Sequence, residues 1–208
     1  MSSVLNIQSS PRGARSASVA VADAFLLAYL AEHPGTTVDT LNVFEEALPE
    51  YDADAIGAKY KGAADEEMNS VEAVLWKRIQ TLAERFQKAD LIVLGVPMWN
   101  FAYPYKLKQL IDLVCQRNML FTFDGTTFGP KLSTPKALVI YTRGQTYAED
   151  SVTPASRFDH QTGYIDFWLN FIGVKEVLKV VVENTWSDEA NSRIEAGKAE
   201  AIALANAF

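Results

Sequence analysis

Five short apolar runs, separated by longer segments with helical periodicity, constrain the fold more than any other feature of this sequence. Strands that alternate with helices pair in parallel through right-handed crossovers. The pattern therefore predicts an α/β fold, with a doubly wound five-stranded parallel sheet and helices on both of its faces. The expected strands span residues 4–8, 37–43, 91–96, 136–142 and 177–183.

The segments between these runs have the apolar periodicity of helices. Helices are expected over residues 16–32, 70–88 and 160–172, and after Pro104. A last helix is expected to begin near Ser187, with Asp188 and Glu189 in its first turn, where the helix dipole favours acids. Residues 45–67 are acidic, rich in alanine and interrupted by proline and glycine, and we interpret them as a long surface connection.

The composition indicates one globular domain that spans residues 1–208. Hydrophobic residues make up 49% of the chain, which excludes disorder, and the net charge of −7 argues against binding to nucleic acid or an anionic membrane. The single cysteine, Cys115, excludes an internal disulfide and is compatible with a reducing compartment. Without a signal-peptide pattern or a run of ~20 apolar residues, we expect a cytoplasmic protein with no membrane span.

The most informative segment for function follows the third strand, at residues 97–105. In open α/β sheets, ligands bind at the carboxyl ends of the strands, where this segment is expected to lie. Trp99, Phe101 and Tyr103 offer flat apolar faces. Asn100 offers both a hydrogen-bond donor and an acceptor. A flat heterocycle with a polar edge, such as a flavin, needs this combination.

A second segment, residues 8–18, joins the first strand to the first helix. It matches neither the G-x-G-x-x-G dinucleotide fingerprint nor the nucleotide-triphosphate loop G-x-x-x-x-G-K-[ST]. It contains two arginines and the hydroxyls of Ser10, Ser16 and Ser18 beside a helix N-terminus, which favours an anion. Taken alone, a serine-rich helix cap is an equal alternative. The aromatic segment at the same edge favours the binding of a terminal phosphate.

A third segment follows the fourth strand, where Gly144 permits a tight turn or a close approach of the backbone. Taken alone, it is most simply an ordinary turn between a strand and a loop. Its expected position, at the same edge of the sheet as the other two segments, matches the far side of a mononucleotide flavin.

Other reactive residue types give weaker signals. Cys115 falls within the apolar stripe of the helix after Pro104, which indicates a small core residue rather than a nucleophile. The two histidines, His33 and His160, are far apart in the sequence and lack clustered partners, so no metal site is expected.

Together, the three segments resemble the FMN-dependent NADH-azoreductase family, which is related to the NAD(P)H:quinone reductases. The resemblance extends in spacing along nearly the whole chain, and three positions depart from the family pattern. Trp99 replaces a tyrosine, Thr142 a serine and Gln145 a second glycine. The residues that carry the resemblance are Ser10 with Ser16-Ala17-Ser18, Pro97-Met98-Trp99-Asn100-Phe101, and Thr142-Arg143-Gly144-Gln145.

The resemblance implies the strand order 2-1-3-4-5 of a flavodoxin-like sheet. It also implies bound FMN, NADH or NADPH as the hydride donor, and two-electron reduction of quinones and aromatic azo compounds by a ping-pong mechanism. Because the flavin would carry the chemistry, no side chain is expected to be catalytic. The implied assembly is a homodimer with the acceptor slot between its protomers.

The same resemblance implies roles for particular residues. Ser10 and residues 16–18 would hold the phosphate, residues 97–101 would cover the polar edge and one face of the ring, and residues 142–145 would line its far side. Asn100 and Phe101 would also meet the acceptor. The walls of the acceptor slot would include Phe123 and Phe171, the latter from a partner subunit. For Phe171, which lies on an aromatic helical stripe, an ordinary core position is the simpler alternative.

Two other functions remain open on the sequence. A flavodoxin-type carrier would bind FMN and pass single electrons to protein partners, but such carriers tend to be shorter and strongly acidic around the flavin. An NAD(P)H:FMN reductase would release free reduced flavin. The arginines of the second segment and the additional aromatic residues after the third strand favour the enzyme over the carrier.

Overall fold

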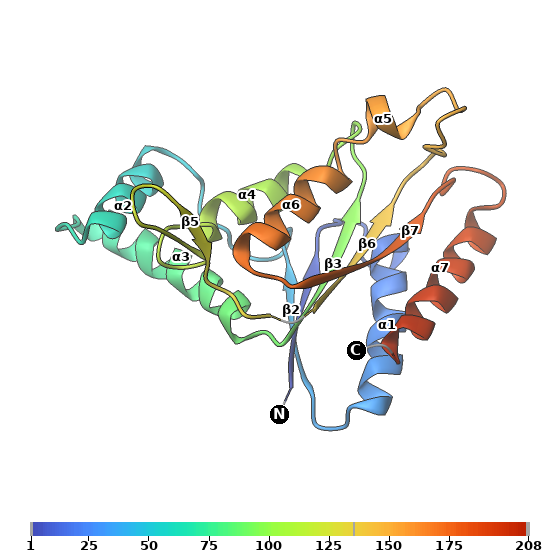
Figure 1. The fold of residues 1–208 in the computed structure, drawn as a ribbon, viewed down its shortest axis with the longest axis horizontal. Coiled ribbons are helices and arrows are strands. Elements are labelled where there is room, and N and C mark those ends of the chain that lie inside the picture. The colour runs from blue at the N-terminus through green and yellow to red at the C-terminus, as the bar shows by residue number, and fades with distance from the viewer. Residues whose placement is uncertain (1, 135, 207–208) are drawn as a thin grey trace.

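A five-stranded parallel sheet lies at the centre of the structure, a computed structural model that describes residues 2–134 and 136–206 (Figure 1). Its order is β2-β1-β3-β6-β7, and every neighbouring pair is parallel. Counted along the chain, this is the order 2-1-3-4-5, so the prediction of a flavodoxin-like sheet is confirmed. The strands are β1 (Ser3–Gln8), β2 (Thr37–Asn42), β3 (Leu91–Pro97), β6 (Lys136–Thr142) and β7 (Glu176–Val182).

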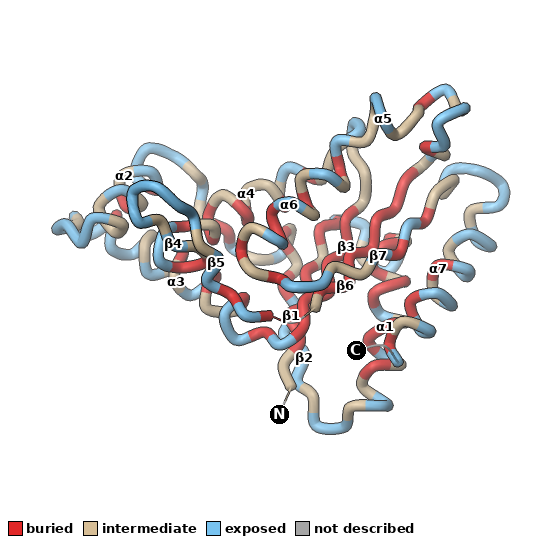
Figure 2. The backbone as a smooth tube through the Cα atoms, viewed as in Figure 1, coloured by how far each residue is buried: buried red, intermediate tan, exposed pale blue. Residues whose placement is uncertain are grey.

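Helices cover both faces of the sheet (Figure 1). Alternate residues of a strand point to opposite faces, so Val93 packs with α1 and α7 whereas Ile92 and Leu94 pack with α3, α4 and α6. Because both faces are covered, β3 and β6 are almost entirely buried (Figure 2). The helices are α1 (Ala17–Glu32), α3 (Ser70–Lys88), α4 (Tyr105–Val114), α6 (Thr162–Ile172) and α7 (Ala190–Ala205).

A helix between β2 and α3 was not expected from the sequence. The interpretation of residues 45–67 as a surface connection is wrong, because they contain α2 (Ala53–Ala64). Asp52 caps this helix by accepting two backbone N–H hydrogen bonds at 3.0 and 3.1 Å. The glycines of the stretch lie inside the helix, where a Cβ on Gly62 would lie 2.2 Å from the ring of Trp76 in α3. They mark a close contact between helices rather than a loop.

The last helix begins later than predicted. It starts at Ala190 rather than near Ser187, so the two acidic residues expected in its first turn precede it. Asn184 adopts a left-handed φ of 59°, and the N–H of Ser187 donates to the Asn184 carbonyl at 3.1 Å. This turn delays the helix and leaves a structured segment between β7 and α7.

Short elements complete the fold. Strands β4 (Phe121–Phe123) and β5 (Phe128–Pro130) form an antiparallel pair beside α6 (Figure 1). A 3-10 helix spans Gly13–Arg15, and α5 spans Ala155–Phe158. Strands of three residues are too short to give a periodic pattern, and their signal in the sequence is the Asp124-Gly125 pair, which is typical of a hairpin turn.

Gly173 ends α6 in a position that only glycine fits. Its φ is 112°, and a Cβ there would lie 2.2 Å from the backbone oxygen of Leu132. Since the Leu132 N–H donates to the Ile172 carbonyl at 2.9 Å, the two segments cannot separate without losing that bond. We therefore expect Gly173→Ala to lower the free energy of unfolding by about 2 kcal/mol or more, as measured by urea unfolding.

The matched control is Gly163→Ala in the same helix. Among the described residues, no atom lies within 4 Å of a Cβ built on Gly163. Alanine at this position should raise the free energy of unfolding by at most about 1 kcal/mol. Equal effects of the two substitutions would contradict the close contact at Gly173.

Candidate functional site

Three strands end at one edge of the sheet, and their ends and the segments that follow them contribute walls to a cavity of about 410 Å³. These segments come after β1, β3 and β6, as the sequence predicted. The volume lies within the range of ~300–1,000 Å³ that is usual for ligand sites. The cavity lining includes seven of the predicted site residues: Ser10, Ser16, Ala17, Pro97, Met98, Trp99 and Thr142.

The first segment presents hydrogen-bonding groups to one wall of this cavity. Within the described chain, the Ser16 hydroxyl makes no capping hydrogen bond to α1, and its Oγ lies 3.1 Å from the Oγ of Ser18. Ser10, Ser16 and Ser18 are all buried. The first N–H groups of α1 carry the positive end of the helix dipole. Hydroxyls beside a helix N-terminus that they do not cap are suited to an anion.

Arg12 and Arg15 add positive charge to the same wall. Both are exposed and line the cavity, and its lining includes no acidic residue among those that the structure describes. A larger hollow of about 590 Å³ lies near α1 and β2, but its lining includes Asp23, Glu45 and Glu46, and its one arginine is paired with Glu46. The charge of the linings therefore favours a phosphate in the smaller cavity.

The aromatic segment contains a strained turn. Trp99 and Ala102 exchange backbone hydrogen bonds at 2.8 and 3.0 Å, which closes a turn around the two residues between them. Asn100 and Phe101 both adopt left-handed conformations, with φ of 47° and 70°. Asparagine tolerates this conformation, but a bulky residue adopts it rarely, and such strain is concentrated at functional sites.

Neighbouring segments hold this turn in place. The His160 N–H donates to the Phe101 carbonyl at 3.0 Å, and the rings of Phe101 and Phe158 lie 5.2 Å apart. The Met98 N–H donates to the Thr142 carbonyl at 2.8 Å, which extends the contact between β3 and β6 past the strand ends. A segment that is already ordered loses less entropy when a ligand binds.

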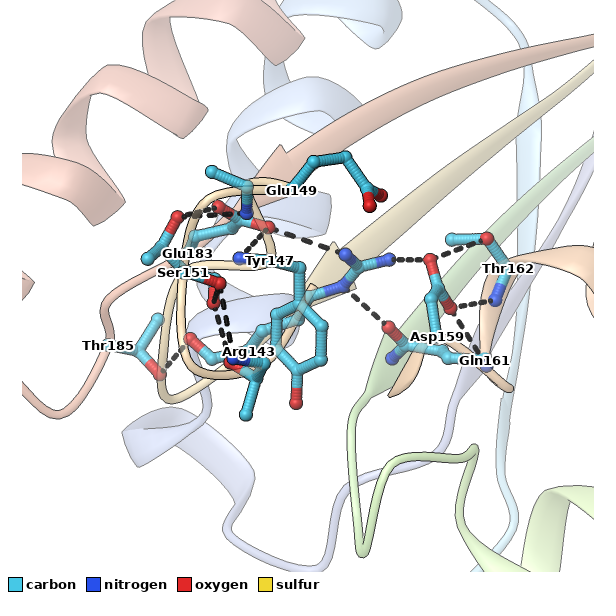
Figure 3. A network of polar contacts seen from close by, with 12 residues as sticks. Arg143, Tyr147, Glu149, Ser151, Asp159, Gln161, Thr162, Glu183 and Thr185 are labelled. Atoms are coloured by element: carbon cyan, nitrogen blue, oxygen red, sulfur yellow. Dashed lines mark hydrogen bonds and ion pairs between the residues drawn. The ribbon is translucent and has the colours of Figure 1, made fainter. Parts of the chain in front are cut away.

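Arg143 is absent from the cavity lining, and its side chain enters a buried ion network (Figure 3). The side chain is 5% exposed, and its guanidinium lies 2.6 Å from Asp159 and 3.3 Å from Glu183. Its Nε donates to Gln161 Oε1 at 3.0 Å, and Gln161 Nε2 donates to the Val96 carbonyl at 2.8 Å. One arginine thus links the ends of β6, β7 and β3 with the start of α6.

Asp159 is charged in this network. Burial opposes its ionisation, but hydrogen bonds from Thr162 and Gln161 and the charge of Arg143 outweigh that effect and lower its pKa. The N–H groups of Gln161 and Thr162 both donate to Oδ1 at 2.9 Å. The carboxylate is therefore a permanent counter-charge for Arg143 at neutral pH.

Other predicted residues lie around the cavity rather than in its lining. Asn100 and Phe101 form the exposed tip of the turn, and Gln145 is also exposed. Ser18 is buried behind Ser16. Gly144 lies against the indole of Trp186 rather than open to the cavity.

Phe123 and Phe171 are not brought to the cavity within one chain. Both belong to a group of rings on β4, β5 and α6, in which Phe128 lies 4.6 Å from Phe123 and 5.7 Å from Phe171. Phe128 and Phe167 are 58% and 63% exposed, so the aromatic stripe of α6 is not wholly buried. We call these four residues, Phe123, Phe128, Phe167 and Phe171, the phenylalanine patch.

One wall of the cavity was not predicted from the sequence. The rule that ligands bind beyond the carboxyl ends of strands applies to the fifth strand as well, and a tryptophan soon after that strand is the signal that could have revealed it. The missed lining residues follow β7 and open α7: Thr185, Trp186, Ala190, Asn191 and Ile194.

Cys115 is not among the described residues that line the cavity. Cys115 follows the end of α4 rather than lying within it, and burial raises the pKa of its thiol. Residues 2–134 and 136–206 contain no group of three or more His, Cys, Asp or Glu side chains that could hold a metal ion. None of the helices in these ranges is long and apolar enough to cross a membrane.

Comparisons with known proteins match the chain along nearly its whole length. Residues 2–205 match a family model described as a flavodoxin-like fold. The chain is 58% identical to FMN-dependent NADH:quinone oxidoreductase 2 of Burkholderia lata over 99% of both chains, and 41% identical to FMN-dependent NADH:quinone oxidoreductase 3 of Pseudomonas fluorescens over 98% of this chain and 96% of that one. The solved structure of an azoreductase from Bacillus anthracis superimposes with a TM-score of 0.90 and 28% identity over 100% of both chains.

The Arg143 network predicts that the protein loses stability in acid. We expect Asp159→Asn to lower the free energy of unfolding at neutral pH by about 3 kcal/mol, because a buried guanidinium loses a counter-charge. Since the pKa of Asp159 is lowered in the folded protein, its stabilising contribution is complete above the unfolded value of about 3.9. That contribution is lost as the pH falls through the folded value.

Urea unfolding between neutral pH and about pH 3 measures both effects. The Asp159→Asn variant should lose less stability on acidification than the wild type does. Asp150→Asn, at an exposed position, is the control and should leave both the stability and its pH dependence unchanged. An acid response of Asp159→Asn equal to that of the wild type would contradict the lowered pKa.

Proposed function

The chain belongs to the family with a flavodoxin-like fold, and we propose that it is an FMN-dependent NADH:quinone oxidoreductase that also reduces aromatic azo compounds. The names of its relatives in Burkholderia and Pseudomonas and of the Bacillus azoreductase support this function. One observation of the site carries the proposal. Buried serine hydroxyls beside the N-terminus of α1 share a single cavity with the indole of Trp99.

The residues of the cavity fit FMN as a ligand with an anionic end and a planar end. Ser10 and residues 16–18 would hold the phosphate together with the first N–H groups of α1. Arg12 and Arg15 would balance its charge. Hydrogen bonds to a charged oxygen are worth about twice as much as neutral ones, so this wall would supply much of the affinity.

The other walls would hold the ring. Residues 97–101 would cover its polar edge and one face, and the Thr142 hydroxyl would donate a hydrogen bond. Arg143 would support the site from the ion network, with Gly144 and Gln145 shaping the loop at the far side. The relatives are named for NADH, which supports NADH as the hydride donor.

When bound, FMN supplies the chemistry, by accepting a hydride and returning two electrons. The chain binds and orients the reactants. Met98 and Trp99 exclude water from part of the cavity, and Phe101, which is 41% exposed, offers an apolar face to a flat donor or acceptor. The Asn100 amide at the tip of the turn offers a donor and an acceptor to the polar edge of that molecule. We also propose a cytoplasmic location, with which the single cysteine is compatible.

Donor and acceptor would use the slot beside Asn100 and Phe101 in turn, which gives ping-pong kinetics. Initial rates with NADH and a small quinone test this, and double-reciprocal plots at several quinone concentrations should be parallel. Intersecting lines would contradict a shared slot. Absence of turnover in a protein that exchanges single electrons with a partner would favour a flavodoxin-type carrier, and loss of the flavin on desalting would favour an FMN reductase.

The phosphate assignment predicts a selective loss of affinity. We expect Ser16→Ala combined with Ser18→Ala to weaken the binding of FMN by about 1.5–3 kcal/mol for each charge-assisted hydrogen bond lost. Riboflavin, which has the same ring and no phosphate, should bind the double variant as it binds the wild type. Fluorescence titration of the flavin-free protein with both ligands measures this. Equal losses for FMN and riboflavin would place the serines at the ring instead.

The phenylalanine patch supports the proposal of a homodimer. Large exposed apolar patches mark interfaces, and two-fold dimers are the commonest assemblies. Phe123 and Phe171 lie in the patch and away from the cavity of their own chain, so a second copy could bring them to a slot between protomers. In this arrangement the acceptor slot would need both subunits.

A substitution that prevents dimerisation should therefore also lower quinone turnover. We expect Phe167→Asp, at a 63% exposed position, to shift the protein to monomers and to lower quinone turnover by a similar factor. Leu27→Asp, at a 74% exposed apolar position on α1, is the control and should change neither property. Light scattering and activity on one dilution series provide the measurement. A fully active wild-type monomer would contradict the shared slot.

A further inference from the structure

The segment between β7 and α7 contributes an aromatic side chain, Trp186, to the cavity. Trp186 and Trp99 are the two aromatic residues among the described residues that line it, and they come from different segments. Arg12 and Arg15 line the same cavity. The lining therefore combines two indoles with a cationic wall, which suits a ligand that is both planar and anionic.

The backbone of Trp186 is fixed to the third segment. The Thr185 hydroxyl donates to the Arg143 carbonyl at 2.9 Å (Figure 3). The Thr185 N–H donates to the same carbonyl at 3.0 Å. The Trp186 N–H donates to the Gly144 carbonyl at 3.3 Å. These bonds extend the contact of β6 and β7 beyond the strands and connect it to the residue at the centre of the ion network. The fold therefore sets the position of the indole.

The indole lies directly against Gly144. A Cβ on Gly144 would lie 2.3–2.6 Å from three of the ring atoms, so any other residue would displace the ring. The φ of Gly144 lies outside the left-handed region, which means that the backbone conformation itself does not require glycine. Glycine at this position is needed because Trp186 packs there.

Most of the Trp186 surface is exposed to solvent. Trp186 is 79% exposed, although its backbone is held and its ring packs on the turn. Tryptophan carries a large apolar surface, about 150–250 Å² when buried, which the core of this chain does not use. A planar ligand in the cavity would cover this surface and would be kept from the bare backbone of Gly144.

We propose that Trp186 is a cofactor-binding residue whose indole contacts the flavin ring in place of the Gly144 backbone. The inference rests on the proposed function, because it takes FMN as the occupant of the cavity. In this proposal, a side chain from the segment after β7 contacts the far side of the ring. The family resemblance implied instead that the turn at residues 142–145 lines that side. One contact then accounts for the exposed indole, its fixed backbone and the glycine beneath it.

Titration of flavin-free protein with FMN and with riboflavin tests this contact. Trp186→Ala should weaken both flavins by the same factor, roughly tenfold, because the lost contact is with the ring that they share. Trp186→Phe should restore most of the affinity. The visible absorption band of bound FMN should shift in Trp186→Ala. Trp76→Phe, at the contact of α2 and α3, is the matched control and should change neither the affinity nor the band.

Gly144→Ala tests the packing independently. It should displace the indole and weaken both flavins as Trp186→Ala does, and the double variant should bind no more weakly than either single variant. Thermal unfolding of each flavin-free variant separates a loss of binding from a loss of fold. Unchanged affinity and spectrum in Trp186→Ala, tighter binding, or additive losses would overturn the proposal. A wild-type protein that binds no flavin would instead overturn the proposed function.

Discussion

A buried arginine keeps the functional edge of the sheet in one arrangement. Parallel strands bring their carboxyl ends to a common edge, but the segments beyond them need separate contacts to hold their relative positions. Arg143 supplies these contacts through Asp159, Glu183 and Gln161, and its guanidinium also lies 4.9 Å from the centre of the Tyr147 ring. Burial of a charge is costly unless its hydrogen bonds are satisfied, so the network favours the complete arrangement over any partial one. The segments beyond β3, β6 and β7 are consequently one unit.

The turn that is closed by Trp99 and Ala102 is a strained part of this unit. A left-handed phenylalanine is unfavourable in an isolated chain, yet Phe101 is held by the His160 N–H and by the ring of Phe158. Those two residues flank Asp159, which pairs with Arg143 in the ion network. The fold thus stabilises a conformation that exposes Phe101 and Asn100 at the tip, beside the cavity.

The sheet and its order could be predicted because buried strands and amphipathic helices leave periodic patterns, and because the family motifs lie at strand ends. The glycines of α2 were misleading, since Gly57 and Gly62 allow close contact with Glu72 and Trp76, a long-range cause that local sequence does not reveal. Among the described residues, six of the fourteen that line the cavity were predicted as site residues from two segments. The role of Arg143 could not, because its partners lie 16 and 40 residues away. Trp186 was hidden by the expectation that the helix begins at Ser187.

The distribution of charge would favour small anions over large ones at the cavity. Arg12 and Arg15 stand exposed at the cavity of a chain whose net charge is −7. At physiological ionic strength their field extends only about 8 Å before counterions screen it. A compact phosphate ester fits inside that radius and meets attraction alone. A long polyanion would extend beyond that radius and meet the net negative charge of the chain, so this distribution would favour a mononucleotide over a nucleic acid.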